Sequence, residues 1–373
     1  MVARGKAAAA AAASTAGAVE WTPLGCGLAE LTLSNTLVTG QSFRWAETSP
    51  GEFVGVLGRR VVALRQQPSG QVEYQVLLAA AGEQLAPAAD SLREYFNLSV
   101  SLERLFQEFG AADERFKAVA PYLPGTRMLR QDPTECLFSF ICSQNNHVSR
   151  IGGMVERLCS EYGTPLGTAA PPSGAAEPRA YYAFPTLEQL SSASDERLRE
   201  LGFGYRAKYI VGASAALLAK EGGGHEWLLA LRTAPYREAA AALCELPGIG
   251  PKVAACVCLF ALDKHEVVPV DVHVWRMAVT YYSPDLEGKS LTPRVTAAVE
   301  DAFVRVFGPY AGWAHLTLFI AALASHRTLL PEALRTPTPS ERKRKLKKEK
   351  EEGEDAGEES EPKKKVPKAK RAL

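Results

Sequence analysis

Apolar and polar residues alternate with a period of two between about Leu28 and Ala80, as in strands that bury one face. Gly, Pro and Ser residues separate the alternating segments, which is typical of an antiparallel sheet. Two segments with helical apolar spacing follow them. In chain order, the five expected strands and two expected helices are LAELTLSN, SFRW, EFVGVL, RRVVALRQ, VEYQVLLA, LREYFNL and LERLFQEF.

From Glu114 onward the apolar spacing is helical. We expect an apolar helix with a polar tip over 133–146, two helices around a GFGYR turn over 194–219, and an amphipathic helix over 310–323. Residues 163–180 are rich in Pro, Gly and Ala without any period, which predicts a surface loop. The predicted fold class is therefore α+β, with the sheet first and the helices after it.

These changes of pattern divide the chain into four predicted parts. An Ala-rich disordered start over 1–20 precedes a sheet domain with helices over 21–112. A mostly helical domain follows over 113–332. The remainder, 333–373, has almost no large apolar residues and is expected to be disordered.

The stretch 246–273 joins two helices through a turn that contains glycine. Helix formers fill 236–246, an apolar helix is expected over 252–262, and Gly248 and Gly250 lie between them. Such a turn points backbone N–H groups at an anion, so a phosphate can bind there and at the N-terminus of the second helix. An ordinary helical hairpin is the alternative.

Two residues of this stretch favour covalent chemistry. Lys252 falls in the first turn of the second helix, where the dipole disfavours a cation, so we expect an amine that is readily neutral and nucleophilic. Asp271 falls at an expected N-cap, where N–H groups keep a carboxylate ionised. Together they suit a reaction through an oxocarbenium-like centre. Alternatively, Lys252 only contacts a phosphate and Asp271 only caps a helix.

Composition and charge narrow the picture. The chain of 373 residues is 46% hydrophobic, enough for a core, and no apolar run is long enough for a membrane helix. The seven cysteines form no CxxC pair, so we expect reduced thiols and no structural zinc. Residues 336–373 carry 13 Lys/Arg and 9 Asp/Glu, which leaves 30 and 33 elsewhere. Residues 1–335 therefore carry no excess of positive charge. A polyanion would have to bind a local basic patch and backbone N–H donors on this part of the chain.

Several motifs resemble one group of enzymes. LPGIGPK (246–252) followed by VPVDVHV (268–274) resembles the helix-hairpin-helix, Gly-Pro-Asp superfamily of DNA base-excision glycosylases. Further segments resemble its eukaryotic 8-oxoguanine DNA glycosylase/AP lyase members, and the resemblance covers roughly residues 25–330. These segments are GQSFRW, LRQDPTECLFSFICSQNN, GFGYRAKYI and GPYAGWAHLTLF.

The resemblance implies a TBP-like antiparallel sheet domain, a helical glycosylase domain, and removal of 8-oxoguanine paired with cytosine from duplex DNA. It implies that the base flips out, that Lys252 attacks C1′ with the help of Asp271, and that a Schiff base then permits β-elimination. No cofactor and no catalytic metal are implied.

The same resemblance implies residue roles around the flipped base. The carbonyl of Gly40 would accept the hydrogen that distinguishes the oxidised purine from guanine, and Phe319 would stack on the base opposite Cys256. Asn145 would fill the space left by the base, and Tyr205 would wedge into the stack. Pro269 and His315 complete the implied base pocket, and Asn146, Arg150, Arg206, Gly248, Gly250 and His273 complete the implied DNA contacts, with both arginines at the orphaned cytosine.

Two positions depart from the family pattern. His315 stands where the family typically has a glutamine that recognises the Watson–Crick edge of the base, and imidazole lacks the two-pronged geometry of an amide. Ala322 stands where an aspartate near the phosphate-contacting histidine is usual. These changes bear on base recognition more than on the chemistry.

Double-stranded DNA with 8-oxoguanine opposite cytosine is the expected partner of a monomeric protein, with downstream repair proteins as further partners and no membrane. The clusters KRKLKK and PKKKVPKAKR predict nuclear import, and the Ala-rich start leaves the mitochondrion as a second location. Two alternatives stay open. A glycosylase for another damaged base usually lacks the hairpin lysine, and a noncatalytic hairpin module would form no covalent DNA adduct.

Overall fold

The computed structural model describes residues 20–80, 85–338, 340–341 and 344. The chain forms two compact units, Met1–Leu330 and Pro331–Leu373. The Ala-rich start and most of the charged tail, both expected to be disordered, lie outside the described residues. In the part that is described, no helix has the length and apolarity to cross a membrane. The division into domains at 112/113 stays a prediction.

A five-stranded antiparallel sheet forms, as predicted, with strand order β1-β5-β4-β3-β2. Four of its strands come from the alternating region, and β1 precedes that region. The segment SFRW contributes only its last residue to a strand, and the short first strand was not expected. The strands are β1 Thr22–Pro23, β2 Trp45–Ser49, β3 Glu52–Leu57, β4 Arg60–Gln66 and β5 Val72–Ala79.

The prediction of a strand over LAELTLSN is wrong. Residues 28–30 form a turn, and the helix α1 (Leu33–Thr36) follows. The N–H of Thr32 donates to Gly125 O at 2.9 Å, and the Asn35 amide donates to Pro124 O at 2.9 Å. These distant carbonyls satisfy polar groups that a strand would direct to its neighbour. The alternation arises instead from leucines that enter the core.

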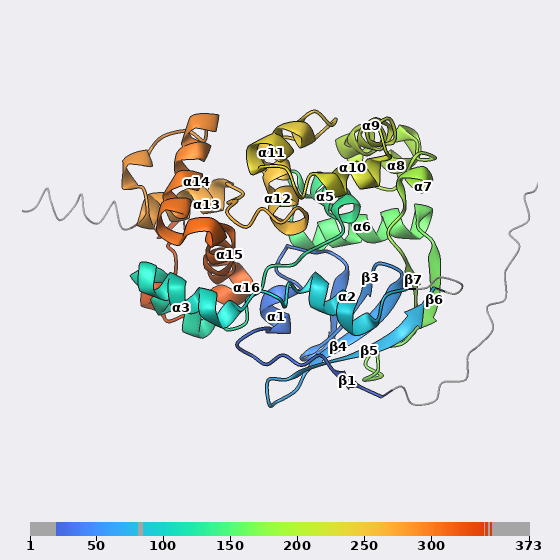
Figure 1. Cartoon of the computed structure of the whole chain (residues 1–373), viewed down its shortest axis with the longest axis horizontal. Helices are drawn as coiled ribbons and strands as arrows, with labels where there is room; N and C mark the ends of the chain where they lie inside the picture. Colours follow the sequence, from blue (N-terminus) through green and yellow to red (C-terminus); the bar gives the residue numbers. More distant parts are fainter. Residues whose placement is uncertain (1–19, 81–84, 339, 342–343, 345–373) are drawn as a thin grey trace, which may run out of the picture. The chain divides into compact units, whose positions relative to one another are not determined.

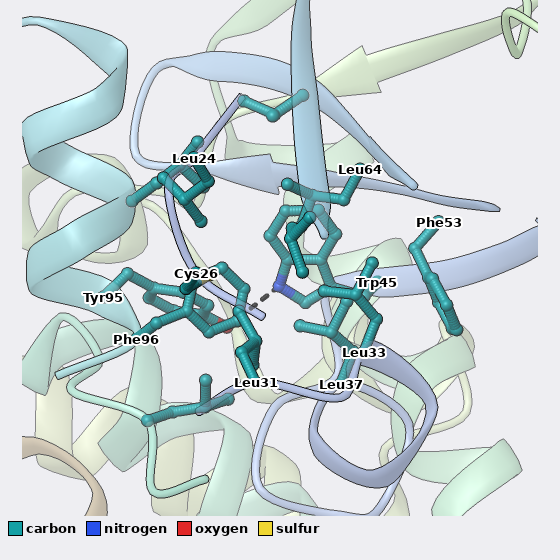
Figure 2. Close-up of a cluster of buried hydrophobic side chains, with 14 residues drawn as sticks. Leu24, Cys26, Leu31, Leu33, Leu37, Trp45, Phe53, Leu64, Tyr95 and Phe96 are labelled. Carbon is teal, nitrogen blue, oxygen red and sulfur yellow. Dashed lines mark hydrogen bonds between the residues drawn. The ribbon is translucent and has the colours of Figure 1, made fainter. Parts of the chain in front are cut away.

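The first face of the sheet packs against α2 (Ala88–Tyr95). Figure 2 shows Trp45 from β2 and Tyr95 from α2 meeting in this cluster, where the indole N–H donates to the Tyr95 hydroxyl at 2.9 Å. Apolar side chains surround the pair, so this hydrogen bond satisfies the polar atom of each ring inside the core. The cluster anchors the segment that runs from Gly40 to β2.

The second face of the sheet is covered by a two-stranded hairpin, β6 (Pro165–Ala169) and β7 (Arg179–Tyr182), which Figure 1 shows at the sheet edge. The prediction of a surface loop over 163–180 is therefore wrong for the two strands and right for the exposed residues 172–178 between them. Tyr181 packs against residues of β3 and β4, and Leu166 joins the same cluster. Pairing and burial create these short strands despite a composition that favours loops.

The helices that follow the sheet confirm the prediction, made from apolar periodicity, that the second half of the chain is mostly helical. Asp132, which directly precedes the predicted helix over 133–146, is its N-cap and accepts a hydrogen bond from the N–H of Glu135 at 2.9 Å. Helix α5 packs against α6, α9, α10 and α12. The bounds are α3 Leu102–Ala112, α4 Glu114–Val119, α5 Pro133–Ser143, α6 Val148–Tyr162, α7 Leu187–Leu190, α8 Asp195–Glu200, α9 Ala207–Leu218, α10 Gly224–Ala230, α11 Tyr236–Cys244, α12 Pro251–Ala261, α13 Val272–Tyr281, α14 Pro293–Phe307, α15 Ala311–Ala322 and α16 Ala324–Arg327.

Helix α15 forms where expected but is not amphipathic. Nearly every side chain of α15 is buried, because α14 and α4 pack against it and α12 approaches it closely. A Cβ on Gly312 would meet the Leu259 side chain at 2.5 Å, which measures how near the two helices lie. This burial places His315 and Phe319 beside α12, which carries Lys252.

Candidate active site

The predicted glycine hairpin joins α11 to α12. Gly248 has a φ of +81°, and a Cβ there would meet the Tyr209 ring at 2.4 Å, so both backbone conformation and space require glycine. Gly250 is the N-cap of α12 and has no side-chain cap, so the first N–H groups of this helix remain available for an anion. The Gln144 amide donates to Gly248 O at 2.7 Å and ties the hairpin to the end of α5.

Asp271 is the N-cap of α13, as predicted. Its carboxylate accepts hydrogen bonds from the N–H groups of His273 and Val274 at 2.8 and 2.9 Å. These two bonds hold one carboxylate oxygen in place, and Asp271 also lines the cavity that Lys252 reaches. The His273 side chain is exposed in the first turn of this helix.

Lys252 lies in the first turn of α12, at the exposed mouth of the cavity, and its amine contacts the buried thiol of Cys256. The Cys256 sulfur and then the Asp271 carboxylate raise the pKa of Lys252 and outweigh the effect of burial. The expectation of a readily neutral amine is therefore wrong for the free protein. Burial raises the pKa of Cys256 against the effect of Lys252.

A cavity of about 70 Å³ brings together the seven residues predicted for catalysis and base binding, which are Lys252, Asp271, Gly40, Cys256, Pro269, His315 and Phe319. Six further residues complete the lining and were not predicted. They are Thr39, Gln41, Phe140, Phe260, Val274 and Leu316. The rings of Phe140 and Phe260 stack at 5.5 Å in the wall. In the sequence these aromatic residues are indistinguishable from core.

His315 presents two buried ring nitrogens without a hydrogen-bond partner among the described residues. Its ring lies 5.9 Å from the Phe319 ring and 5.8 Å from the Phe303 ring, measured between centroids. Burial lowers the pKa of His315 to about 4, so the ring is neutral at physiological pH. A neutral imidazole offers one donor and one acceptor to whatever enters the cavity.

Three predicted DNA contacts are exposed, namely Asn145, Arg150 and Tyr205. Asn145 has a φ of +45°, a turn conformation that asparagine tolerates. The Tyr205 hydroxyl donates to Gln144 O at 3.1 Å while the ring stays 42% exposed. An exposed aromatic ring and an exposed guanidinium suit stacking and base-edge contacts.

Arg206 and Asn146 use their polar groups inside the protein. Arg206 is only 3% exposed, and its guanidinium donates to the carbonyls of Gln144 and Asn145. The amide of Asn146 donates to Cys142 O at 3.0 Å. In this conformation the guanidinium holds the turn at Asn145 together, and the contact of Arg206 with a cytosine stays a prediction.

Two family models match consecutive parts of the chain. The model for the 8-oxoguanine DNA glycosylase N-terminal domain matches residues 23–137, and the HhH-GPD superfamily model of base excision DNA repair proteins matches residues 138–297. The chain belongs to the 8-oxoguanine DNA glycosylase family.

Relatives of this 8-oxoguanine DNA glycosylase span most of its length. It is 46% identical over 314 residues to the Arabidopsis thaliana N-glycosylase/DNA lyase OGG1, covering 84% of this chain and 83% of that protein. It is 36% identical to the Saccharomyces cerevisiae N-glycosylase/DNA lyase, with coverage of 78% and 83%. The Clostridium acetobutylicum 8-oxoguanine glycosylase/lyase, solved with DNA containing cytosine opposite 8-oxoG, superposes with a TM-score of 0.65 at 26% identity, covering 78% and 91%.

The described residues of this glycosylase contain no cluster of three or more His, Cys, Asp or Glu side chains that could hold a metal ion. The groups that the cavity offers for chemistry are an ammonium, a thiol, a carboxylate and an imidazole. These groups match nucleophilic attack at a sugar carbon with electrostatic support, and the helix N-terminus beside them is suited to a phosphate.

Proposed function

We propose that this protein removes 8-oxoguanine opposite cytosine from duplex DNA and then cleaves the strand at the resulting abasic site. One observation carries the proposal: a single cavity beside the α11–α12 hairpin holds the amine of Lys252, the carboxylate of Asp271 and an apolar wall for a purine. The base must leave the stack to reach this cavity, which costs a few kcal/mol. Tyr205 and Asn145 occupy positions where they offset that cost on the duplex side.

The reaction begins with the Lys252 ammonium losing its proton. The amine then attacks C1′, the glycosidic bond breaks, and the purine departs with the bonding electron pair and takes up one proton. Asp271 stabilises the positive charge that develops on the sugar. The C1′–O4′ bond then breaks, O4′ takes up the proton released from the new C1′–N bond, and a protonated Schiff base forms between Lys252 and C1′. Removal of a C2′ proton then breaks the C3′–O bond, and the 3′ phosphate leaves with that electron pair in a β-elimination.

Borohydride trapping tests this chemistry directly. Wild-type protein mixed with an 8-oxoguanine:C duplex and borohydride should give a covalent protein–DNA adduct, and Lys252→Gln should give none while still binding the duplex. Lys289→Gln, at an exposed surface ion pair with Asp285, is the matched control and should trap like the wild type. An adduct of undiminished yield in Lys252→Gln would exclude Lys252 as nucleophile. The absence of any adduct with the wild type would favour the noncatalytic binding module.

The choice of damaged base is tested separately. Duplexes that carry 8-oxoguanine, an alkylated purine or unmodified guanine opposite cytosine are compared in single-turnover excision by the wild type. Excision of 8-oxoguanine at least about tenfold faster than of the other bases is expected. Faster excision of the alkylated purine would make the protein a glycosylase of the alternative class.

We also propose a nuclear location, which the tail clusters at 343–348 and 362–371 support through their composition. A fluorescent fusion of the full chain should accumulate in the nucleus, and replacing both clusters with Gly/Ser should abolish that accumulation. Retention in mitochondria that depends on residues 1–20 would point to the second location instead.

A further inference from the structure

Gln131 joins the two walls of the cavity through hydrogen bonds at both ends of the residue. Its backbone N–H donates to Phe260 O at 2.8 Å, in the last turn of α12. Its side-chain amide donates to Gln41 O at 2.7 Å, in the segment that carries Gly40. Gln131 is 3% exposed and does not line the cavity. It therefore connects the helix of Lys252 to the segment of Gly40 from behind.

Gln41 is held at every polar group that its side chain offers. Its amide N–H groups donate to Thr36 O at 3.2 Å and Arg127 O at 3.0 Å, and its amide oxygen accepts from the N–H of Leu129 at 3.1 Å. With its carbonyl held by Gln131, Gln41 has both its side chain and its backbone fixed. The Gln41 Cα is one end of the planar Gly40–Gln41 peptide, so holding Gln41 in place restricts how far that peptide, which contains the Gly40 carbonyl, can turn.

Gly40 itself cannot supply this restraint. Its φ is +94°, a conformation open mainly to glycine, and among the described residues a Cβ would meet within 4 Å only the Val148 side chain, at 3.6 Å. Because glycine has no side chain to make contacts, its backbone rotates about φ and ψ with little resistance. A hydrogen-bond acceptor needs a defined direction, since the interaction weakens steeply when the angle falls. The direction must therefore come from neighbouring residues.

We propose that Gln131 is a positioning residue for recognition of the oxidised base: through Gln41 it sets the direction of the Gly40 carbonyl relative to α12. This inference rests on the proposed function and on the role that the family resemblance implies for the Gly40 carbonyl, which would accept the N7–H that 8-oxoguanine has and guanine lacks. The Gln131 amide does not touch the base. Its loss should reduce discrimination between the two purines without reducing affinity for DNA that has no base in the pocket.

The test compares dissociation constants in a Lys252→Gln background, which prevents turnover. Three cytosine-paired duplexes are used, carrying 8-oxoguanine, guanine or a tetrahydrofuran abasic analogue. Gln131→Met keeps the length of the side chain and removes the amide, and Gln131→Asn keeps an amide that is too short to reach Gln41. Both should lower the guanine to 8-oxoguanine ratio of dissociation constants by about three- to tenfold, the value of one hydrogen bond. Affinity for the abasic duplex should change less than twofold.

Gln66→Met is the matched control. The Gln66 amide bonds Leu31 O, Gly70 O and the N–H of Leu33, none of which lines the cavity, so the same substitution should leave the ratio unchanged. A preserved ratio in both Gln131 variants would overturn the proposal, as would an equal loss of affinity for all three duplexes. If the Lys252→Gln parent shows no preference for 8-oxoguanine, the proposed function itself fails, and this result is distinct from the other two.

Discussion

Contact with Cys256 affects the protonation of the Lys252 amine in the free protein. The pKa of Lys252 lies above its ordinary value because of Cys256 and Asp271, so the amine is protonated across the physiological range. Attack on C1′ needs the free amine, and the fraction of free amine rises with pH. The sequence placed Lys252 correctly from its hairpin, but the raising effect of two neighbours from other turns was not visible there.

The pH dependence of trapping follows from this charge state. Single-turnover borohydride trapping by the wild type should accelerate between pH 6.5 and 8.5, by up to tenfold for each pH unit, because the folded-state pKa of Lys252 lies above this window. Quenched-flow sampling with gel separation of the adduct measures it. A rate that is flat over the window would mean that substrate binding removes the proton before the measured step.

Because of His315, the free energy of unfolding should decrease as the pH falls. Its pKa is about 4 in the folded state, against an ordinary value of 6.5, so the unfolded chain binds its proton first as the pH falls. Stability is therefore fully present above pH 6.5 and declines toward pH 4. Between pH 7 and 5 the wild type should lose about 2 kcal/mol more than His315→Gln, measured by urea unfolding. Parallel losses in the two proteins would contradict the low pKa.

The same residue should govern base affinity. Both ring nitrogens of His315 are buried and unpaired, and a glutamine amide would present its donor and acceptor on one plane. In the Lys252→Gln background, His315→Gln should tighten binding to 8-oxoguanine duplex severalfold. The wild-type ring should lose its acceptor only near pH 4, rather than near the pH of 6 that an unperturbed histidine suggests. Fluorescence anisotropy from pH 5 to 8 should therefore show no loss due to His315.

Arg150 and Arg206 share a predicted role, but mutating each of them to alanine should have different effects. Arg150 is exposed, so Arg150→Ala should reduce the preference for lesion:C over lesion:A by about 1–3 kcal/mol and leave stability unchanged. Arg206 is buried on the carbonyls of Gln144 and Asn145, so Arg206→Ala should lower stability and weaken all duplexes alike. Competition binding and thermal unfolding distinguish the two. A selective loss of lesion:C preference in Arg206→Ala would show that its guanidinium turns outward on DNA.

Among the elements, α13 combines a structural and a chemical function at its N-cap, Asp271. Asp271→Asn keeps a good N-cap, so stability should change by less than about 1 kcal/mol. Base excision should slow at least ~10²-fold, because a preorganised charge next to the sugar is lost. Single-turnover excision and thermal unfolding are measured on the same preparation. Full activity with reduced stability would leave Asp271 only its capping function.

The β6–β7 hairpin shows how packing can override composition. Tyr181 is 2% exposed in the cluster on the second face of the sheet, so Tyr181→Ala should cost about 3 kcal/mol in unfolding free energy. Tyr122→Ala, at a tyrosine that is 39% exposed, is the control and should cost less than 1 kcal/mol. A small loss in Tyr181→Ala would mean that the hairpin contributes little to the sheet.

At the scale of the whole molecule, periodicity predicted the class of fold and helices such as α2 and α3, which bury one repeating face. Helices α12 and α15 are instead buried on nearly every side. The motif resemblance placed the seven predicted cavity residues. What the sequence could not predict depends on contacts between distant segments. Gln131 meets Gln41 across ninety residues, Leu166 meets the sheet, and Arg206 turns toward Gln144. No local pattern records such pairings.

The hairpin that covers the sheet also has a practical consequence. Its tip, residues 174–178, is exposed and lies between two paired strands whose ends are fixed by the sheet behind them. Loop tips of this kind accept insertions, since the added chain adds only closure entropy. A tetracysteine or fluorophore tag placed at this tip would report the binding of DNA from a position on the β6–β7 hairpin. The cavity residues and the hairpin of α11 and α12 would keep their native contacts.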